Sequence, residues 1–402
     1  MIFENQNFKC KIDITENPMS LNINDYLDMG LRNNKKRNFL FISKKLGKHL
    51  AISPSDMDDL GRNLVSIYND KLDNSNKSAT LISFAETATS LGYSVFKHLD
   101  ENVNEYIHTT RELDAELDEY IEFLEEHSHA SNHKLYTSNL KNIESNDTII
   151  LVDDEITTAK TCVNIIRQLQ DIYPNKNYVI FSILNWISDE RESEIYKEVE
   201  ALGCKVSFVY LFRGNFEFTM NPEGLDVVNR LNNKTINYLT LNFNNEDNSS
   251  YIGEKRYLKY TGRFGMKRED VVEFNSIMER EAKKIDLLVK DKNEKILFLG
   301  TEEFMNIPLE LSSKSKLNNV SFFATTRSPI IPIENNQYPI NSKIEFKSSY
   351  NSDVINYIYN IDKDEYDRCF VFLETKIKDN NKSVIDAIFR NINCKEINVV
   401  TF

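Results

Sequence analysis

One stretch, Thr148–Gln170 (TIILVDDEITTAKTCVNIIRQLQ), constrains the fold more than any other part of this 402-residue chain. Four apolar residues, Ile149–Val152, run into three consecutive carboxylates that begin at Asp153. A hydroxyl-rich segment follows, and apolar residues then recur at helical spacing up to Leu169. We therefore predict a buried strand, a loop and an amphipathic helix, the combination from which α/β proteins are built.

The loop between strand and helix has the chemistry of an anion site. Backbone N–H groups at a helix N-terminus point outward, and the helix dipole favours a negative charge there. The hydroxyls of Thr157, Thr158 and Thr161 add side-chain donors. Carboxylates beside a bound phosphate would repel it, so Asp153 and Asp154 must face another group, such as a sugar diol or Mg²⁺.

This combination of apolar run, two acids and Thr-rich loop resembles the signature with which type I phosphoribosyltransferases bind phosphoribosyl pyrophosphate (PRPP). The resemblance implies that Asp153 and Asp154 are catalytic, hold the ribose hydroxyls and contact a Mg²⁺ cofactor. It assigns the 5′-phosphate to the loop of Thr157, Thr158, Ala159, Lys160 and Thr161. The alternative is an ordinary buried strand followed by a capped helix.

Two residues depart from the family pattern. Ala159 stands where the family usually carries Gly, which affects how closely the loop backbone can wrap a phosphate. Thr157 stands where the purine-salvage members carry an Asp that handles the base. A purine acceptor is therefore disfavoured.

Length and composition limit the class of protein. A chain of 402 residues exceeds what one hydrophobic core usually supports, so we expect two domains. With 41% hydrophobic residues and no apolar run of about 20, we expect a cytoplasmic protein without membrane contact. The net charge of −13 argues against nucleic acid as a partner. Five dispersed cysteines without a CxxC pair indicate neither disulfides nor a zinc ribbon.

An earlier strand, loop and helix precede this stretch. Residues 79–84 have the pattern of a strand and residues 90–99 that of a helix. In the family the equivalent loop binds pyrophosphate, which here would be Ala85, Glu86, Thr87, Ala88 and Thr89. Glu86 would then have to turn away from the pyrophosphate or meet it through Mg²⁺. Arg111, after the next strand, suits a bidentate contact with the same group.

Residues 119–136 gather acids and histidines where the family keeps a mobile hood loop over PRPP. The resemblance implies that this hood excludes water and that His127 or His129 neutralises departing pyrophosphate or acts as an acid–base group. Three closely spaced histidines, the third being His133, could instead ligate a transition metal. A structural loop held by hydrogen bonds is the remaining interpretation.

Alternating strand and helix patterns continue through residues 177–212, which predicts a parallel sheet with helices on both faces. Trp186 and Arg213 fall at carboxyl ends of strands, where such sheets bind ligands, and we consider them for the acceptor site. A lone Trp is more often a core or interface residue. We expect a first domain over residues 1–245, with 1–34 as an irregular arm, and a second over 246–402.

The second domain resembles a degenerate copy of the first. The spacing from Phe84 to Thr109 is 25 residues, and the spacing from Leu299 to Thr325 is 26. A strand ending at Glu374 has one acid and no Thr-rich loop. We predict a duplicated unit whose second copy has lost PRPP binding but still binds a small anion or the acceptor. The candidate residues there are Arg263, Thr301, Glu302 and Arg327; the alternative is that the arginines are solvated or structural.

Seven blocks of the sequence, taken in order, resemble bacterial phosphoribosyltransferases with a C-terminal TRSP domain, which are found in tellurite-resistance and stress gene clusters. The blocks include SKKLGKH, FAETATS, LVDDEITTAKT, GTEEF and ATTRSP. The resemblance implies a PRPP-dependent enzyme that transfers phosphoribosyl to a small-molecule acceptor of unstated identity, with a homodimer left open. Two alternatives remain. One is a PRPP-sensing module without turnover, and the other is a phosphoribosyl lyase or hydrolase.

Overall fold

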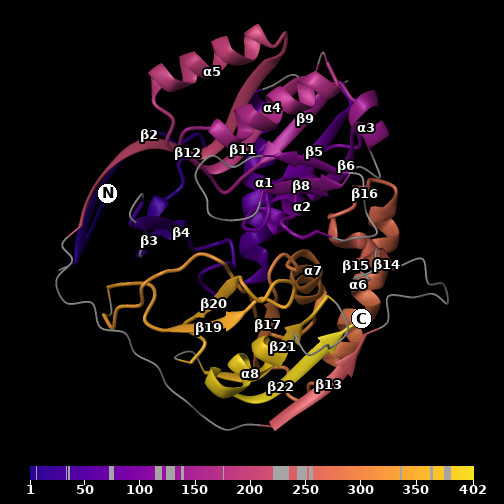
Figure 1. Ribbon diagram of the computed structural model, residues 1–402. Helices are drawn as coiled ribbons and strands as arrows, with labels where there is room; N and C mark the ends of the chain where they lie inside the picture. Colours follow the sequence, from indigo (N-terminus) through magenta and orange to yellow (C-terminus); the bar gives the residue numbers. More distant parts are fainter. Residues whose placement is uncertain are drawn as a thin grey trace.

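Two mainly parallel sheets form the two halves of the computed structural model (Figure 1). The structure describes residues 1–402 except 6, 33, 35–36, 72–76, 114–119, 124–131, 137–139, 175, 221–234, 242–250, 253–256, 336, 363–364 and 375–381. Helices α1, α2 and α7 contact one another between the sheets.

The first sheet has the order β1 (Ile2–Asn5), β2 (Phe8–Glu16), β12 (Lys205–Met220), β11 (Asn177–Asn185), β9 (Thr148–Val152), β5 (Ala79–Ser83), β6 (Val103–His108) and β16 (Met266–Lys267), with β10 (Glu155–Ile156) beside β11. Its helices are α1 (Pro54–Lys71), α2 (Thr89–His98), α3 (Leu140–Ser145), α4 (Lys160–Ile172) and α5 (Asp189–Ala201). Every residue of β5 and β9 is buried, as expected for central parallel strands covered by helices.

The second sheet has the order β13 (Thr235–Thr240), β22 (Cys394–Thr401), β21 (Tyr366–Phe372), β17 (Lys295–Gly300) and β18 (Asn319–Ala324). Helices α6 (Asp270–Asp286), α7 (Asn306–Lys314) and α8 (Lys382–Asn391) accompany it. Four two-stranded ribbons complete the described chain: β3–β4 (Leu27–Leu31, Phe39–Ser43), β7–β8 (Tyr120–Phe123, His133–Tyr136), β14–β15 (Tyr251–Ile252, Tyr257–Leu258) and β19–β20 (Lys343–Lys347, Ile355–Tyr359).

The two halves have the same strand order, which supports the predicted duplication. The series β11-β9-β5-β6 matches β22-β21-β17-β18 both in the sheet and along the chain, and all neighbours in it are parallel. The strand β13 takes the place of β12 beside this series, also in parallel, but it comes first along the chain and β12 comes last. The same registers align Ser83 with Gly300 and Val152 with Phe372. One β-ribbon in each half, β7–β8 or β19–β20, bridges to the threonine after the edge strand.

Each half completes the edge of the other half's sheet. Met266 of β16 pairs with Tyr106 of β6, and Ile52 pairs with Phe322 of β18. A glycine with positive φ precedes each crossing segment: Gly47 at 67° and Gly262 at 92°. A Cβ at Gly47 would lie 2.7 Å from the Phe322 ring, and one at Gly262 would lie 2.3 Å from the Tyr106 ring. Both positions therefore need glycine for conformation and for space.

The N-terminal region corrects the sequence interpretation. Residues 1–34 were expected to be irregular, but β1 and β2 extend the first sheet and β3 pairs with β4. Residues 8–12 of β2 alternate buried and exposed side chains, which is the period of a half-buried strand. Sheet membership also changes earlier than residue 245, because β13 already belongs to the second sheet.

Among the described residues, none of the helices has the length and apolarity that a membrane span requires.

Candidate functional site

The acid loop after β9 lies at the carboxyl edge of the first sheet. The Asp153 N–H donates to the Phe181 carbonyl at 3.0 Å, and the Asp154 N–H donates to Asp153 Oδ1 at 2.9 Å. Glu155 is held aside by an ion pair of 2.5 Å with Arg37. The backbone is therefore fixed at the two acids, and the third acid is directed to a different partner.

The electrostatics of Asp154 suit a cation ligand. Burial, followed by the neighbouring charge of Glu155, raises the pKa of Asp154 above its ordinary value. No ion pair links Asp154 to any residue that the structure describes. Oxygen donors of this kind are what Mg²⁺ prefers, and a divalent cation here would restore the charged form. The donor set of Asp153 and Asp154 thus fits a hard cation.

The Thr-rich loop presents donors at the start of α4. Thr157 and Thr158 are exposed, and Ala159 adopts a left-handed conformation with φ of 54°. The backbone N–H groups of Thr157, Thr158 and Ala159 have no acceptor within the described parts of the chain. Arg191 of α5 donates to the Thr158 carbonyl at 3.2 Å and holds the loop from outside. Free amides at the N-terminus of a 13-residue helix form an anion-binding arrangement.

The loop after β5 presents a second set of donors. Thr109 Oγ1 accepts the Ala85 N–H at 2.9 Å, and the Thr89 hydroxyl donates to the Glu86 carbonyl at 2.9 Å. The N–H groups of Glu86 and Thr87 have no acceptor among the residues described. Glu86 itself turns its carboxylate toward Thr326 and Arg327 of the second half, and Lys48 of the first half also contacts it.

Arg111 and the described part of the hood adjoin this loop. Arg111 lies 3.3 Å from His133 Nε2 through its guanidinium, and its N–H donates to Glu303 at 2.8 Å. His133 Nδ1 is 2.8 Å from Thr109 Oγ1. His133 is therefore a buried hydrogen-bonded residue. His127 and His129 lie outside the described residues, as does the predicted linker 244–250. The described residues hold no cluster of three or more potential metal ligands.

The same positions in the second half are filled by the protein's own side chains. Glu374 aligns with Asp154 in the strand register and forms an ion pair of 2.6 Å with Arg263. Tyr350 donates to the other Glu374 oxygen at 2.9 Å. Arg263 also pairs with Glu303 at 3.2 Å, and all three of these charged side chains are buried. The acid that corresponds to Asp154 is therefore already neutralised.

The second-half loop bonds two of its amides internally. The Phe304 N–H donates to the Thr301 carbonyl and the Met305 N–H to the Glu303 carbonyl, both at 2.9 Å. Ser348 donates to Glu302 at 2.5 Å, and the Ser349 N–H donates to Glu302 at 2.8 Å. Burial raises the pKa of Glu302 to about 7.

The structure brings together some of the sequence-predicted acceptor residues and separates others. Arg263, Thr301, Glu302 and Arg327 lie in one buried cluster where the loops of both halves meet. Trp186 instead packs against Phe41, with ring centroids 4.8 Å apart. Arg213 pairs with residues of β2 and α5, namely Glu16, Asp189 and Glu192. Neither joins the cluster.

Two acids of this cluster were missed as site residues: Glu112, which pairs with Arg327 at 2.7 Å, and Glu303, which accepts from Thr110 at 2.5 Å. The repeated Thr-Thr-Arg at 109–111 and 325–327 was the available signal. Each Thr-Thr-Arg follows the last strand of its half's parallel series, β6 or β18, and contacts the loop of the opposite half.

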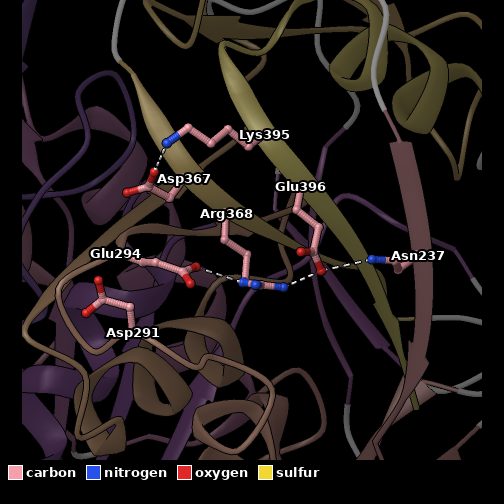
Figure 2. Close-up of a pocket in the computed structure, with 7 residues that line it drawn as sticks. All are labelled: Asn237, Asp291, Glu294, Asp367, Arg368, Lys395 and Glu396. Carbon is pink, nitrogen blue, oxygen red and sulfur yellow. Dashed lines mark hydrogen bonds and ion pairs between the residues drawn. The ribbon is translucent and has the colours of Figure 1, made fainter.

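A surface pocket lies elsewhere, lined by Asn237, Asp291, Glu294, Asp367, Arg368, Lys395 and Glu396 (Figure 2). It sits at the amino ends of β17, β21 and β22, opposite the loops described above. Its charged groups pair with one another: Arg368 contacts Glu294 and Glu396, and Lys395 contacts Asp367. This arrangement presents no unpaired cation for an anionic ligand.

Comparison with known families agrees with the geometry. A family described as "Phosphoribosyl transferase" matches residues 26–215, and one described as "TRSP domain C terminus to PRTase_2" matches residues 260–388. The chain belongs to the phosphoribosyl transferases with a C-terminal TRSP domain. The first half is the phosphoribosyl transferase domain, and the second contains the TRSP domain. The comparison with curated proteins found no match.

Solved structures with similarity to this phosphoribosyl transferase include purine enzymes. The adenine phosphoribosyltransferase from Giardia lamblia, complexed with 9-deazaadenine, is 14% identical over 46% of this chain and 93% of its own, with a TM-score of 0.32. That from Trypanosoma brucei, complexed with AMP, pyrophosphate and ribose-5-phosphate, is 14% identical with a TM-score of 0.29. The match covers 39% of this chain and 65%, under two thirds, of that enzyme. Similarity at this level does not identify an acceptor.

Proposed function

We propose that the first half transfers the 5-phosphoribosyl group of PRPP to a small-molecule acceptor and releases pyrophosphate. The observation that carries the proposal is the contrast between equivalent loops. In the first half, the N–H groups of Thr157–Ala159 and of Glu86 and Thr87 have no acceptor among the described residues, and Asp154 forms no ion pair with any of them. In the second half, Glu374, which aligns with Asp154, is paired with Arg263, and the Phe304 N–H, which aligns with that of Thr87, donates to the Thr301 carbonyl.

The proposed roles follow from the donors and charges of each loop. The Thr157–Thr161 loop binds the 5′-phosphate through amides and hydroxyls. Asp153 and Asp154 accept hydrogen bonds from the ribose diol and stabilise positive charge as it develops at the ribosyl centre. The Glu86 and Thr87 amides, with Arg111, bind the pyrophosphate that departs. When bound, Mg²⁺ would neutralise charge on the pyrophosphate oxygens.

Binding of Mg²⁺·PRPP measured by calorimetry tests the proposal. We expect the wild type to bind and the Asp153→Asn/Asp154→Asn variant to lose at least about 100-fold in affinity, because both diol acceptors lose their charge. Glu374→Gln is the matched control, since it changes the aligned acid of the second half. It should leave the affinity for PRPP unchanged. Wild-type protein that does not bind PRPP, or equal loss in both variants, would contradict the assignment.

Once an acceptor is known, pyrophosphate release separates transfer from the alternatives. Binding without pyrophosphate release would favour a PRPP-sensing module. Release of ribose 5-phosphate from a nucleotide in the absence of PRPP would favour a lyase or hydrolase. The open amides in the first half are compatible with all three, and the carboxylates beside the ribosyl position favour a reaction at the ribosyl centre over binding without turnover.

A further inference from the structure

We infer that Thr326 and Arg327 of the second half are positioning residues for the pyrophosphate loop of the first half. The inference rests on the proposed function, because it assumes that the loop at Glu86 and Thr87 binds pyrophosphate. It assigns the TRSP domain a direct part in the chemistry of its neighbour. The contact joins residues 240 positions apart in the chain.

The Glu86 carboxylate is held by the second half. Its Oε1 accepts from the Thr326 hydroxyl at 3.2 Å and from the Arg327 N–H at 2.8 Å. Lys48 lies 3.3 Å from Oε1, and Arg327 Nε lies 3.7 Å from Oε2. Glu86, Lys48 and Thr326 are buried, so these contacts form without competing water.

These contacts on the Glu86 carboxylate determine which face of the loop a ligand meets. With the carboxylate directed at Thr326, the N–H groups of Glu86 and Thr87 point to no acceptor in the described chain. A carboxylate released from the second half would be free to approach the same amides or the bound anion. Both outcomes weaken pyrophosphate binding, one by competition for donors and the other by like-charge repulsion.

A reciprocal contact, from the first half to Glu303 of the second, shows that the same geometry can join the two halves without positioning a pyrophosphate loop. Thr110 donates to Glu303, and the Arg111 N–H donates to the same carboxylate, so the geometry is duplicated. The loop that Glu303 belongs to already has its Phe304 and Met305 amides bonded internally. The same contact therefore holds two loops that differ at one aligned amide: the Thr87 N–H has no acceptor among the described residues, and the Phe304 N–H is bonded within its loop.

The test compares three ligands on the full-length protein: Mg²⁺·PRPP, Mg²⁺·pyrophosphate and ribose 5-phosphate. Thr326→Val removes the hydroxyl donor to Glu86 and should weaken PRPP and pyrophosphate by about tenfold, the usual effect of losing a hydrogen bond to a charged group. Ribose 5-phosphate uses the other two loops, so its affinity should change by less than about twofold. A general structural defect would weaken all three ligands.

A second variant tests whether the charge of Glu86 causes the loss of pyrophosphate affinity. Glu86→Gln on the Thr326→Val background removes the released charge and should recover most of the lost pyrophosphate affinity. Tyr350→Phe is the control, because it removes a hydroxyl donor to the buried Glu374 of the second half. It should leave all three affinities unchanged.

The outcomes are distinct. Wild-type protein that binds neither PRPP nor ribose 5-phosphate overturns the proposed function and the inference with it. Wild-type binding that Thr326→Val leaves intact for pyrophosphate, or lowers equally for ribose 5-phosphate, overturns only the inference. If Thr326→Val does not fold, Arg327→Lys keeps the backbone donor and the charge but not the guanidinium. It should weaken PRPP and pyrophosphate selectively by about threefold, and an unselective effect would overturn the inference.

Discussion

The two halves share one scaffold and differ in what their loops face. In the first half, the acid at the end of the central strand, Asp154, has no ion pair with a described residue. In the second half, the aligned Glu374 is paired with Arg263 and bonded to Tyr350. Lys48 stands at the position of Arg263, since each follows an equivalent glycine, and it pairs with Glu86 but with no acid after β9. The comparison teaches that one scaffold can leave an acid without an ion pair in one copy and pair the aligned acid internally in the other.

The largest effect on the free energy of unfolding is expected at Arg263, which pairs with two acids inside the second half. Arg263→Met leaves Glu303 and Glu374 buried without their shared cation, so the free energy of unfolding should fall by about 3–5 kcal/mol. Urea unfolding of the full chain measures it. Adding Glu374→Gln should recover part of the loss, because one buried charge is removed with the cation.

Lys48→Met is the comparison in the first half. It breaks one ion pair with Glu86, whose carboxylate keeps two donors from Thr326 and Arg327, so the loss should be clearly smaller. Equal losses for Lys48→Met and Arg263→Met would show that the two halves do not differ in how their charges are compensated.

A smaller, pH-dependent effect is expected from Glu302. Burial raises its pKa to about 7 from the ordinary 4.5, so the folded protein binds this proton more tightly than the unfolded chain. The free energy of unfolding therefore falls as pH rises from about 4.5 to about 7, and the loss is complete above that range. The size is on the order of 3 kcal/mol.

Comparing the pH dependence of the wild type with that of Glu302→Gln isolates the contribution of Glu302. His49 and His108 titrate in an overlapping range with the opposite sign, because burial lowers the pKa of His49 to about 3 and that of His108 to about 4. Both histidines remain in the variant, so they cancel in the difference between the two proteins. Urea unfolding at pH 5 and pH 8 should show the variant gaining on the wild type at the higher pH. A difference that does not change with pH would mean that Glu302 has no raised pKa.

The sequence was sufficient for the fold class and for most elements, because their hydrophobic periods are strong. The β5 and β9 strands and the α2 helix lie within a few residues of their expected bounds. It also indicated the duplication, since the Thr-Thr-Arg repeats stand at nearly equal distances, 25 and 26 residues, from the corresponding strands. The β1–β2 extension was missed because the alternation in Phe8–Glu16 was not read as a strand.

The pairing between halves could not be predicted from local pattern. That Glu86 meets Thr326, and Glu303 meets Thr110, depends on how the two sheets face each other, and no period within either segment encodes it. The packing of Trp186 could not be predicted for the same reason. Its strand end was correctly expected, but its packing on Phe41 and Phe216 is set by β4 and β12.

The smallest change in the free energy of unfolding is expected at Ala159, where the sequence departs from the family pattern. Its φ of 54° is the left-handed region, which costs a residue with a Cβ about 1 kcal/mol. Ala159→Gly removes this strain but adds conformational freedom to the unfolded chain, so the free energy of unfolding should rise by no more than about 0.5 kcal/mol. The same substitution in a right-handed helix, Ala387→Gly in α8, should lower it by about 1 kcal/mol. Opposite signs from one chemical change would show that the loop holds its left-handed turn in solution, ready to present amides to the 5′-phosphate. Equal losses at both positions would show instead that Ala159 relaxes out of that turn, and that the phosphate loop forms only when its ligand binds.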